Sequence, residues 1–106
     1  MKLRHLQSML EDVKSFSDPK YNLEQYSTSP HLAASMIFSI EQSYGDITGK
    51  NVADLGCGCG MLTIAAACMG ARLSIGFDVD VDALGICHQN LTRHDIEAKL
   101  IHSPRK

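Results

Sequence analysis

The segment NVADLGCGCGMLTIAA, residues 51–66, is the most informative part of the sequence, because a glycine-rich turn in it joins a strand pattern to an apolar helix pattern. Three glycines in this turn alternate with Cys57 and Cys59. Such a turn suits either a metal site made by thiolates or a nucleotide-binding loop made by the glycine backbone. The spacing and the flanking residues distinguish these two kinds of site.

The cysteine spacing is wrong for a structural zinc site. Such sites use cysteines two to four residues apart, matched by a second pair or by histidines. Only one residue separates Cys57 from Cys59, and Cys68 and Cys87 stand alone in helical patterns. Free cysteine is commonly a small buried packing residue. We therefore expect no metal site here.

The composition sets limits on the class of protein. The 106 residues suffice for one domain at most, and a hydrophobic content of 44% is typical of a globular chain. A net charge of −2 provides no general electrostatic attraction for nucleic acid, although a local patch is not excluded. The N-terminus lacks the apolar core of a secretory signal, and no apolar run is long enough to cross a membrane. Four cysteines without a signal indicate a reducing compartment, nuclear or cytoplasmic.

Apolar spacing outside the loop predicts alternating helices and strands. Leucines from Leu3 to Leu10 recur at three- and four-residue intervals, which indicates a one-sided helix. Ser29 followed by Pro30 is typical of a helix start. The expected set is helices over residues 3–14, 30–44, 61–69 and 82–93, and strands over 52–55, 72–78 and 99–102.

This order of elements predicts an α/β fold. A strand, a glycine loop, a helix, a second strand and a second helix form the opening of a doubly wound, Rossmann-like sheet. Parallel sheets are normally buried on both faces, whereas two or three strands leave long edges and one face uncovered. We therefore expect an incomplete sheet, the first half of a larger domain.

Acidic residues on both sides of the loop favour nucleotide binding. Asp78 ends the run LSIGFD about 20 residues after Gly56, which is where a ribose-binding carboxylate stands in such folds. A structural alternative is an ordinary carboxylate at the end of a strand. The glycines Gly56, Gly58 and Gly60 let the backbone approach a ligand closely.

The identity of the nucleotide depends on two positions. Dinucleotide folds use G-x-G-x-x-G, and the third glycine of that pattern would fall at Met61. Asp54 lies two residues before the first glycine, where a carboxylate suits the cationic sulfonium and ammonium groups of S-adenosylmethionine. Alternatively, Asp54 organises the loop by accepting its backbone N–H groups. The pattern favours S-adenosylmethionine and leaves an NAD-binding module as the weaker alternative.

Three stretches, VADLGCGCGMLTIAA, IGFDVDVDAL and LEQYSTSPHLAA, together closely resemble the methyltransferase-like protein 5 family. The resemblance covers residues 3–98. It implies a class I S-adenosylmethionine-dependent N6-adenine methyltransferase acting on 18S ribosomal RNA, paired with a small zinc-binding activator subunit. It also implies that Gln25 and Thr28 contact the methyl donor, that Gly56, Cys59 and Met61 line its loop, and that Asp78 holds the ribose.

The catalytic motif of that family is missing from these residues. The family carries Asn-Pro-Pro-Phe, whose polar groups orient the target amine and whose ring stacks on the base, and no such motif follows Gly60. Upstream, Asp18-Pro19-Lys20-Tyr21 resembles a variant of it, but follows a helical pattern and is interpreted as a turn. We therefore assign no catalytic residue and expect no methyl transfer from residues 1–106 alone.

The leading hypothesis is the donor-binding portion of an rRNA N6-adenine methyltransferase. Residues 1–30 would supply an N-terminal helix and a donor-contacting loop, and residues 31–106 a partial Rossmann-like domain. The alternatives are a non-catalytic truncated product or an activator-binding module. The candidate cofactor-binding residues are Gln25, Thr28, Asp54, Gly56, Gly58, Cys59, Gly60, Met61 and Asp78.

Overall fold

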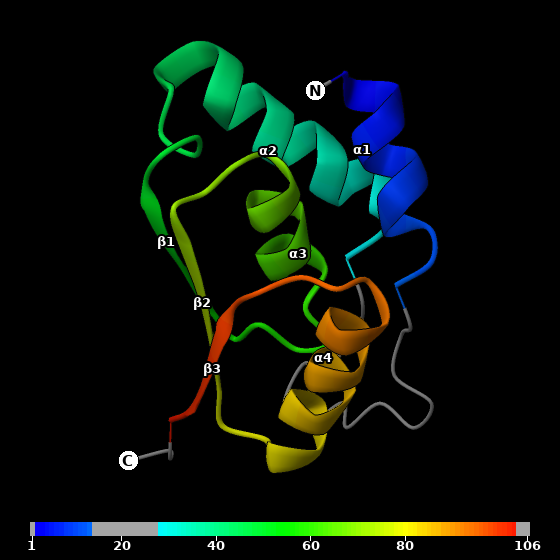
Figure 1. The fold of residues 1–106 in the computed structure, drawn as a ribbon, viewed down its shortest axis with the longest axis vertical. Coiled ribbons are helices and arrows are strands. Elements are labelled where there is room, and N and C mark those ends of the chain that lie inside the picture. The colour runs from blue at the N-terminus through cyan, green and yellow to red at the C-terminus, as the bar shows by residue number, and fades with distance from the viewer. Residues whose placement is uncertain (1, 14–27, 104–106) are drawn as a thin grey trace.

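The computed structural model describes residues 2–13 and 28–103, in which helices and strands follow the expected order (Figure 1). Within these residues, no helix has the length and apolar character needed to cross a membrane. The elements are α1 (Leu3–Leu10), α2 (Pro30–Tyr44), β1 (Asn51–Leu55), α3 (Met61–Cys68), β2 (Leu73–Asp78), α4 (Val81–Arg93) and β3 (Lys99–His102).

The helix α2 begins and ends at the residues that its sequence signals. The Ser29 hydroxyl accepts a hydrogen bond from the Leu32 N–H at 3.1 Å, and Pro30 occupies the first turn, where its missing N–H costs nothing. At the other end, Gly45 adopts a left-handed φ of 63°, which a residue without a Cβ tolerates well. Local chemistry alone therefore predicts the bounds of this helix.

The first helix is shorter than the apolar periodicity predicts. α1 ends at Leu10, and the Val13 N–H donates to the Leu10 carbonyl in a three-residue turn. Val13 is nevertheless buried with Leu6 and Leu10. The periodicity correctly identified the buried positions but not the end of the helix, because a turn also brings Val13 to the core.

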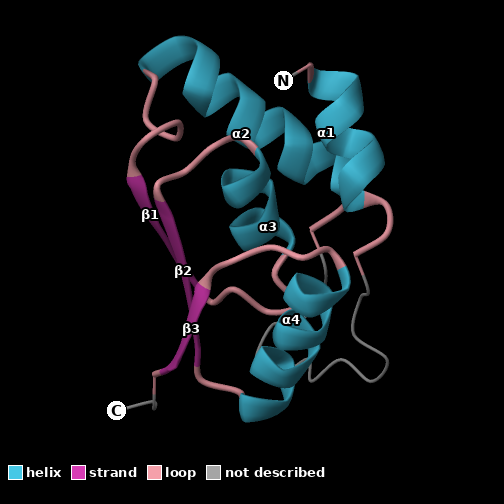
Figure 2. Cartoon of the chain, in the orientation of Figure 1, coloured by secondary structure: helices cyan, strands magenta, loops and turns pink. Residues whose placement is uncertain are grey.

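The sheet has three parallel strands in the order β1-β2-β3. Successive crossovers in one direction, each with the usual right-handed sense, place their helices on the same face. Accordingly, α3 packs against β1 and β2, and α4 packs against β2 and β3 (Figure 2). The helices α1 and α2 pack on α3 rather than on the other face of the sheet. The expected α/β fold with an incomplete sheet is confirmed.

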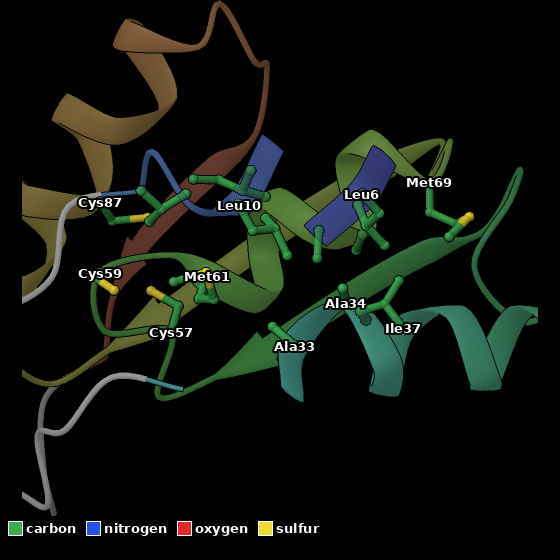
Figure 3. Packing of buried hydrophobic residues seen from close by; sticks show 14 of the residues in the cluster. Leu6, Leu10, Ala33, Ala34, Ile37, Cys57, Cys59, Met61, Met69 and Cys87 are labelled. Atoms are coloured by element: carbon green, nitrogen blue, oxygen red, sulfur yellow. The ribbon is translucent and has the colours of Figure 1, made fainter. Parts of the chain in front are cut away.

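The core lies between this one face of the sheet and the helices. Figure 3 shows side chains from α1, α2, α3 and the glycine loop meeting there, including Leu6, Ala34 and Met61. Small residues on α3, such as Ala65 and Ala66, are fully buried, which allows the helices to approach closely. This core fixes α3 and its N-terminal loop above the carboxyl ends of β1 and β2.

Two glycines provide a matched test of this packing. A Cβ at Gly76 of β2 would lie 2.9 Å from the Cys57 Sγ and 3.1 Å from the Leu100 Cδ2, whereas one at Gly85 of α4 would meet nothing within 4 Å. We expect Gly76→Ala to lower the free energy of unfolding by about 1–3 kcal/mol. Gly85→Ala should raise it by about 1 kcal/mol, because alanine is the better helix former. Equal effects in urea unfolding would contradict this packing.

Candidate functional site

The glycine loop is held in place by the end of the neighbouring strand. The Phe77 carbonyl of β2 accepts hydrogen bonds from the Gly56 N–H at 2.7 Å and the Cys57 N–H at 2.8 Å. Gly56 and Gly58 have φ values of 74° and 55°, in the left-handed region that favours glycine. The loop therefore turns sharply away from β1 and crosses over the end of β2.

Asp78 secures the same loop with its side chain. One carboxylate oxygen accepts the Gly58 N–H at 2.8 Å, and the other accepts the Asp80 N–H at 2.9 Å. Asp78 is only 8% exposed, and these two bonds use part of the acceptor capacity of a carboxylate. The loop-organising role that the sequence suggested as an alternative for Asp54 is thus seen at Asp78.

Asp54 instead contacts the first turns of α3. Its carboxylate accepts a hydrogen bond from the Thr63 hydroxyl at 2.8 Å. The Thr63 carbonyl in turn accepts the Ser74 hydroxyl at 2.9 Å, which ties α3 to β2. Burial raises the pKa of Asp54 above its ordinary value, and the hydrogen bonds from Thr63 oppose that rise only in part. A partly buried carboxylate thus lies beneath the start of α3.

Helix α4 supports the loop from the other side. The buried Asn90 side chain donates to the Cys59 carbonyl at 2.8 Å. A Cβ at Gly60 would lie 2.5 Å from the Cys87 Sγ, so only glycine fits at the start of α3 without movement. Neither Asn90 nor Thr63 was predicted from the sequence. A polar residue directly beside the buried position Leu91 was the only available signal for Asn90.

The loop cysteines are packing residues in this structure. Cys57, Cys59 and Cys87 are all buried, and Figure 3 shows them together beside the loop. A hydrogen bond with Cys87 and, to a smaller extent, burial raise the pKa of the Cys57 thiol. A raised pKa disfavours the thiolate, which is the form that binds metals. Across residues 2–13 and 28–103, no three histidine, cysteine or acidic side chains are grouped to hold a metal ion.

The structure gathers most of the candidate residues at one place. Seven of them lie at the carboxyl ends of β1 and β2, in the loop between β1 and α3, and at the first residue of α3, namely Asp54, Gly56, Gly58, Cys59, Gly60, Met61 and Asp78. The side chains of Cys59 and Met61 are buried in the core, so these two offer a ligand mainly their backbone. Thr28 is half-buried just before the cap of α2, and Gln25 lies outside the described residues.

A glycine loop over the carboxyl ends of parallel strands, with an acid ending the second strand, defines a Rossmann-like nucleotide-binding half-domain. The family model described as ribosomal protein L11 methyltransferase (PrmA) matches residues 26–106. The chain therefore belongs to this methyltransferase family, and it is similar to curated relatives named METTL5 rRNA N(6)-adenosine-methyltransferase.

Two of these relatives show the extent of the likeness. "rRNA N(6)-adenosine-methyltransferase METTL5" of Danio rerio is 50% identical over 96 residues, covering 91% of this chain and 46% of the relative. Its Drosophila melanogaster counterpart, Mettl5, is 46% identical over 96 residues, covering 91% and 45%. The chain thus spans about half the length of the curated relatives that it matches.

Solved structures share the fold. A putative RNA methyltransferase, PH1948 from Pyrococcus horikoshii, superposes with a TM-score of 0.87 at 35% identity, covering 98% of this chain and 51% of that one. Magnesium protoporphyrin IX methyltransferase from Synechocystis, solved with bound SAH, superposes with a TM-score of 0.60 at 26% identity, covering 67% and 33%. The described half-domain is therefore a recurring methyltransferase unit.

The effect of partial burial on the pKa of Asp54 can be tested by measuring stability as a function of pH. Because burial raises its pKa in the folded state, protonation favours folding, and that contribution is lost as the pH rises through the folded pKa. Asp54→Asn keeps an acceptor for Thr63 but removes the charge, so we expect a higher melting temperature than wild type at pH 7. The difference should shrink as the pH falls through the folded pKa. A variant less stable than wild type at pH 7 would contradict this account.

Proposed function

We propose that residues 1–106 form the donor-binding part of an rRNA N6-adenine methyltransferase with S-adenosylmethionine as its cofactor. The observation that carries the proposal is the joint position of the glycine loop, Asp54 and Asp78 at the carboxyl ends of β1 and β2. In open α/β sheets, ligands bind in the crevice outside those strand ends. The names of the relatives support the choice of reaction.

The residues present fit this cofactor. A Cβ at Gly56 would meet nothing within 4 Å, so the loop backbone is open to a ligand there. Asp78 keeps acceptor capacity for the two ribose hydroxyls beyond its bonds from the Gly58 and Asp80 N–H groups. The partly buried charge of Asp54 suits the cationic part of the donor, because attraction between opposite charges is stronger away from water. When bound, the cofactor supplies an electrophilic methyl group.

Donor binding predicts a clear preference among nucleotides. Calorimetry should show that the wild-type chain binds S-adenosylhomocysteine more tightly than NADH. Asp78→Asn should weaken this binding about tenfold, the effect of losing charge-assisted hydrogen bonds to ribose. Asp46→Asn is a matched control, because Asp46 is exposed in the segment between α2 and β1 and should have no effect. Tighter binding of NADH would instead favour a dinucleotide-binding module.

The relatives favour ribosomal RNA over protein as the methyl acceptor. The family model is named for ribosomal protein L11 methyltransferase, which makes a protein acceptor the second candidate. Curated relatives of this chain named for rRNA are 50% and 46% identical over 91% of it, whereas two named ribosomal protein L11 methyltransferase are 46% identical over 51% and 36% identical over 71%. Methyltransferases for either acceptor can share the same donor-binding fold. Residues outside that fold therefore determine which acceptor is methylated.

A chimera tests the acceptor directly. Residues 1–106 would replace the matched segment of the Danio rerio relative, which leaves the rest of that protein unchanged. We expect the chimera to transfer a radiolabelled methyl group to adenine in 18S rRNA, and the same chimera with Asp78→Ala to lose at least about tenfold in rate. Residues 1–106 alone are expected to be inactive. Labelling of L11 but not of rRNA would favour the protein acceptor.

We further propose two properties that rest on the family resemblance alone. The first is binding of a small zinc-binding activator subunit at the free edge of β3, which pairs on its other side with β2. Co-purification of residues 1–106 with such a subunit would test it, and recovery of this chain alone would contradict it. The second is a nuclear or cytoplasmic location, which imaging of a fluorescent fusion would test.

A further inference from the structure

The side of α4 that faces the glycine loop makes one apolar and one polar contact with it. Cys87 and Asn90 are three residues apart, so they lie on the same side of this helix. A Cβ at Gly60 would lie 2.5 Å from the Cys87 Sγ, and the Asn90 side chain donates to the Cys59 carbonyl at 2.8 Å. Figure 3 shows Cys87 and Cys59 near one another beside the loop. Helix α4 therefore contacts two consecutive loop residues, at the point where α3 begins.

The bond from Asn90 helps to fix a whole peptide group. The Cys59 carbonyl and the Gly60 N–H belong to the same peptide, which is planar. Asn90 holds the carbonyl, and the Cys57 carbonyl accepts the Gly60 N–H at 2.9 Å. Rotation of this peptide would break both bonds. Gly60 has a left-handed φ of 97° and precedes α3 directly, so this peptide sets the direction in which α3 leaves the loop.

The loop is held from two sides by elements that are themselves connected. Asp78 accepts the Gly58 N–H with one carboxylate oxygen and the Asp80 N–H with the other. Asp80 is the N-cap of α4, and Asn90 lies near the end of the same helix. The chain thus leaves the loop at Asp78 and returns to it at Asn90. This arrangement holds the loop between the end of β2 and the side of α4.

Asparagine is an unfavourable residue at this position unless its hydrogen bonding is needed. Asn90 is 1% exposed and is one of the largest fully buried side chains of the described residues. A buried amide loses its hydrogen bonds to water, whereas burial of an apolar side chain is favourable. Buried polar groups can specify one arrangement of a structure at a cost in stability. Asn90 is therefore suited to specify the conformation of the loop rather than to stabilise the core.

We propose that Asn90 is a positioning residue for the methyl donor, acting through the peptide between Cys59 and Gly60. This inference rests on the proposed function, in which the glycine loop binds the donor. Without the bond from Asn90, the peptide can rotate, and some molecules have a loop that does not fit the donor. The apparent affinity then falls in proportion to the fraction of molecules that keep the binding conformation.

Calorimetry with S-adenosylhomocysteine tests this role. Asn90→Asp keeps the shape of the side chain but replaces its N–H donor by an oxygen, and Asn90→Leu removes the donor without adding a charge. We expect either variant to raise the dissociation constant about tenfold, because the buried Cys59 carbonyl loses its bond. Leu91→Val is the matched control, because Leu91 is also buried on α4 but lines a groove with the amino ends of β2 and β3. Leu91→Val should bind as wild type does.

Hydrogen exchange separates positioning of the loop from a general loss of stability. In both ligand-free Asn90 variants, the Gly60 N–H should exchange faster, whereas the N–H groups between β1 and β2 should exchange as in wild type. Saturating S-adenosylhomocysteine should restore protection at Gly60, because the ligand selects the binding conformation.

Two results would overturn the role of Asn90. One is wild-type affinity in both Asn90 variants, and the other is equally faster exchange in the loop and in the strands, which would indicate a general loss of stability. If the wild-type chain binds no S-adenosylhomocysteine, the proposed function fails as well. If wild type binds and both Asn90 variants match it, only the role of Asn90 fails.

Discussion

The structure of this chain depends on how the carboxyl end of β2 holds the loop that follows β1. One carbonyl, at Phe77, accepts two loop N–H groups, and the next side chain, Asp78, accepts a third. These bonds require the left-handed backbone of Gly56 and Gly58, and they set where α3 begins. Because α3 then packs on β1, β2 and both N-terminal helices, the position of the core follows from this junction.

The same junction also holds the residues that we propose bind the methyl donor. Asp78 is mostly buried and binds the loop, yet a carboxylate retains acceptor capacity for a ligand. Asp54 carries a charge that burial disfavours, with Thr63 as its partner. Binding sites often retain such costs because the unfavourable group is needed for the ligand.

The strand order and the crossovers explain why one face of the sheet has no helix packed on it. Both crossovers run in the same direction, so α3 and α4 lie on one face, and nothing in residues 2–13 or 28–103 covers the other. The alternation of side chains then exposes Leu55 and Ile101 while it buries Ser74 and Asp78. The relatives that share this unit are about twice as long. The exposed face and the glycine loop thus belong to the same half-domain.

Much of this could be predicted from local sequence. Ser29-Pro30 and Gly45 indicated the ends of α2, the glycine turn indicated the change from strand to helix, and the end of LSIGFD placed Asp78 at a strand terminus. These features depend on backbone chemistry within a few residues, which a sequence displays directly. The early end of α1 could not be predicted, because apolar spacing records which positions are buried rather than the backbone path between them.

The α/β class, the glycine loop and the acidic residues around it could be predicted from the sequence alone. The three-dimensional structure was needed to show that Asp78 rather than Asp54 binds the loop, and that Thr63 and Asn90 support the site. It was also needed to show that the cysteines pack in the core and that the pKa of the Cys57 thiol is raised. The physical reason is that hydrogen bonds between residues distant in the chain depend on how β2 and α4 meet the loop. No local sequence pattern shows how β2 and α4 pack against the loop.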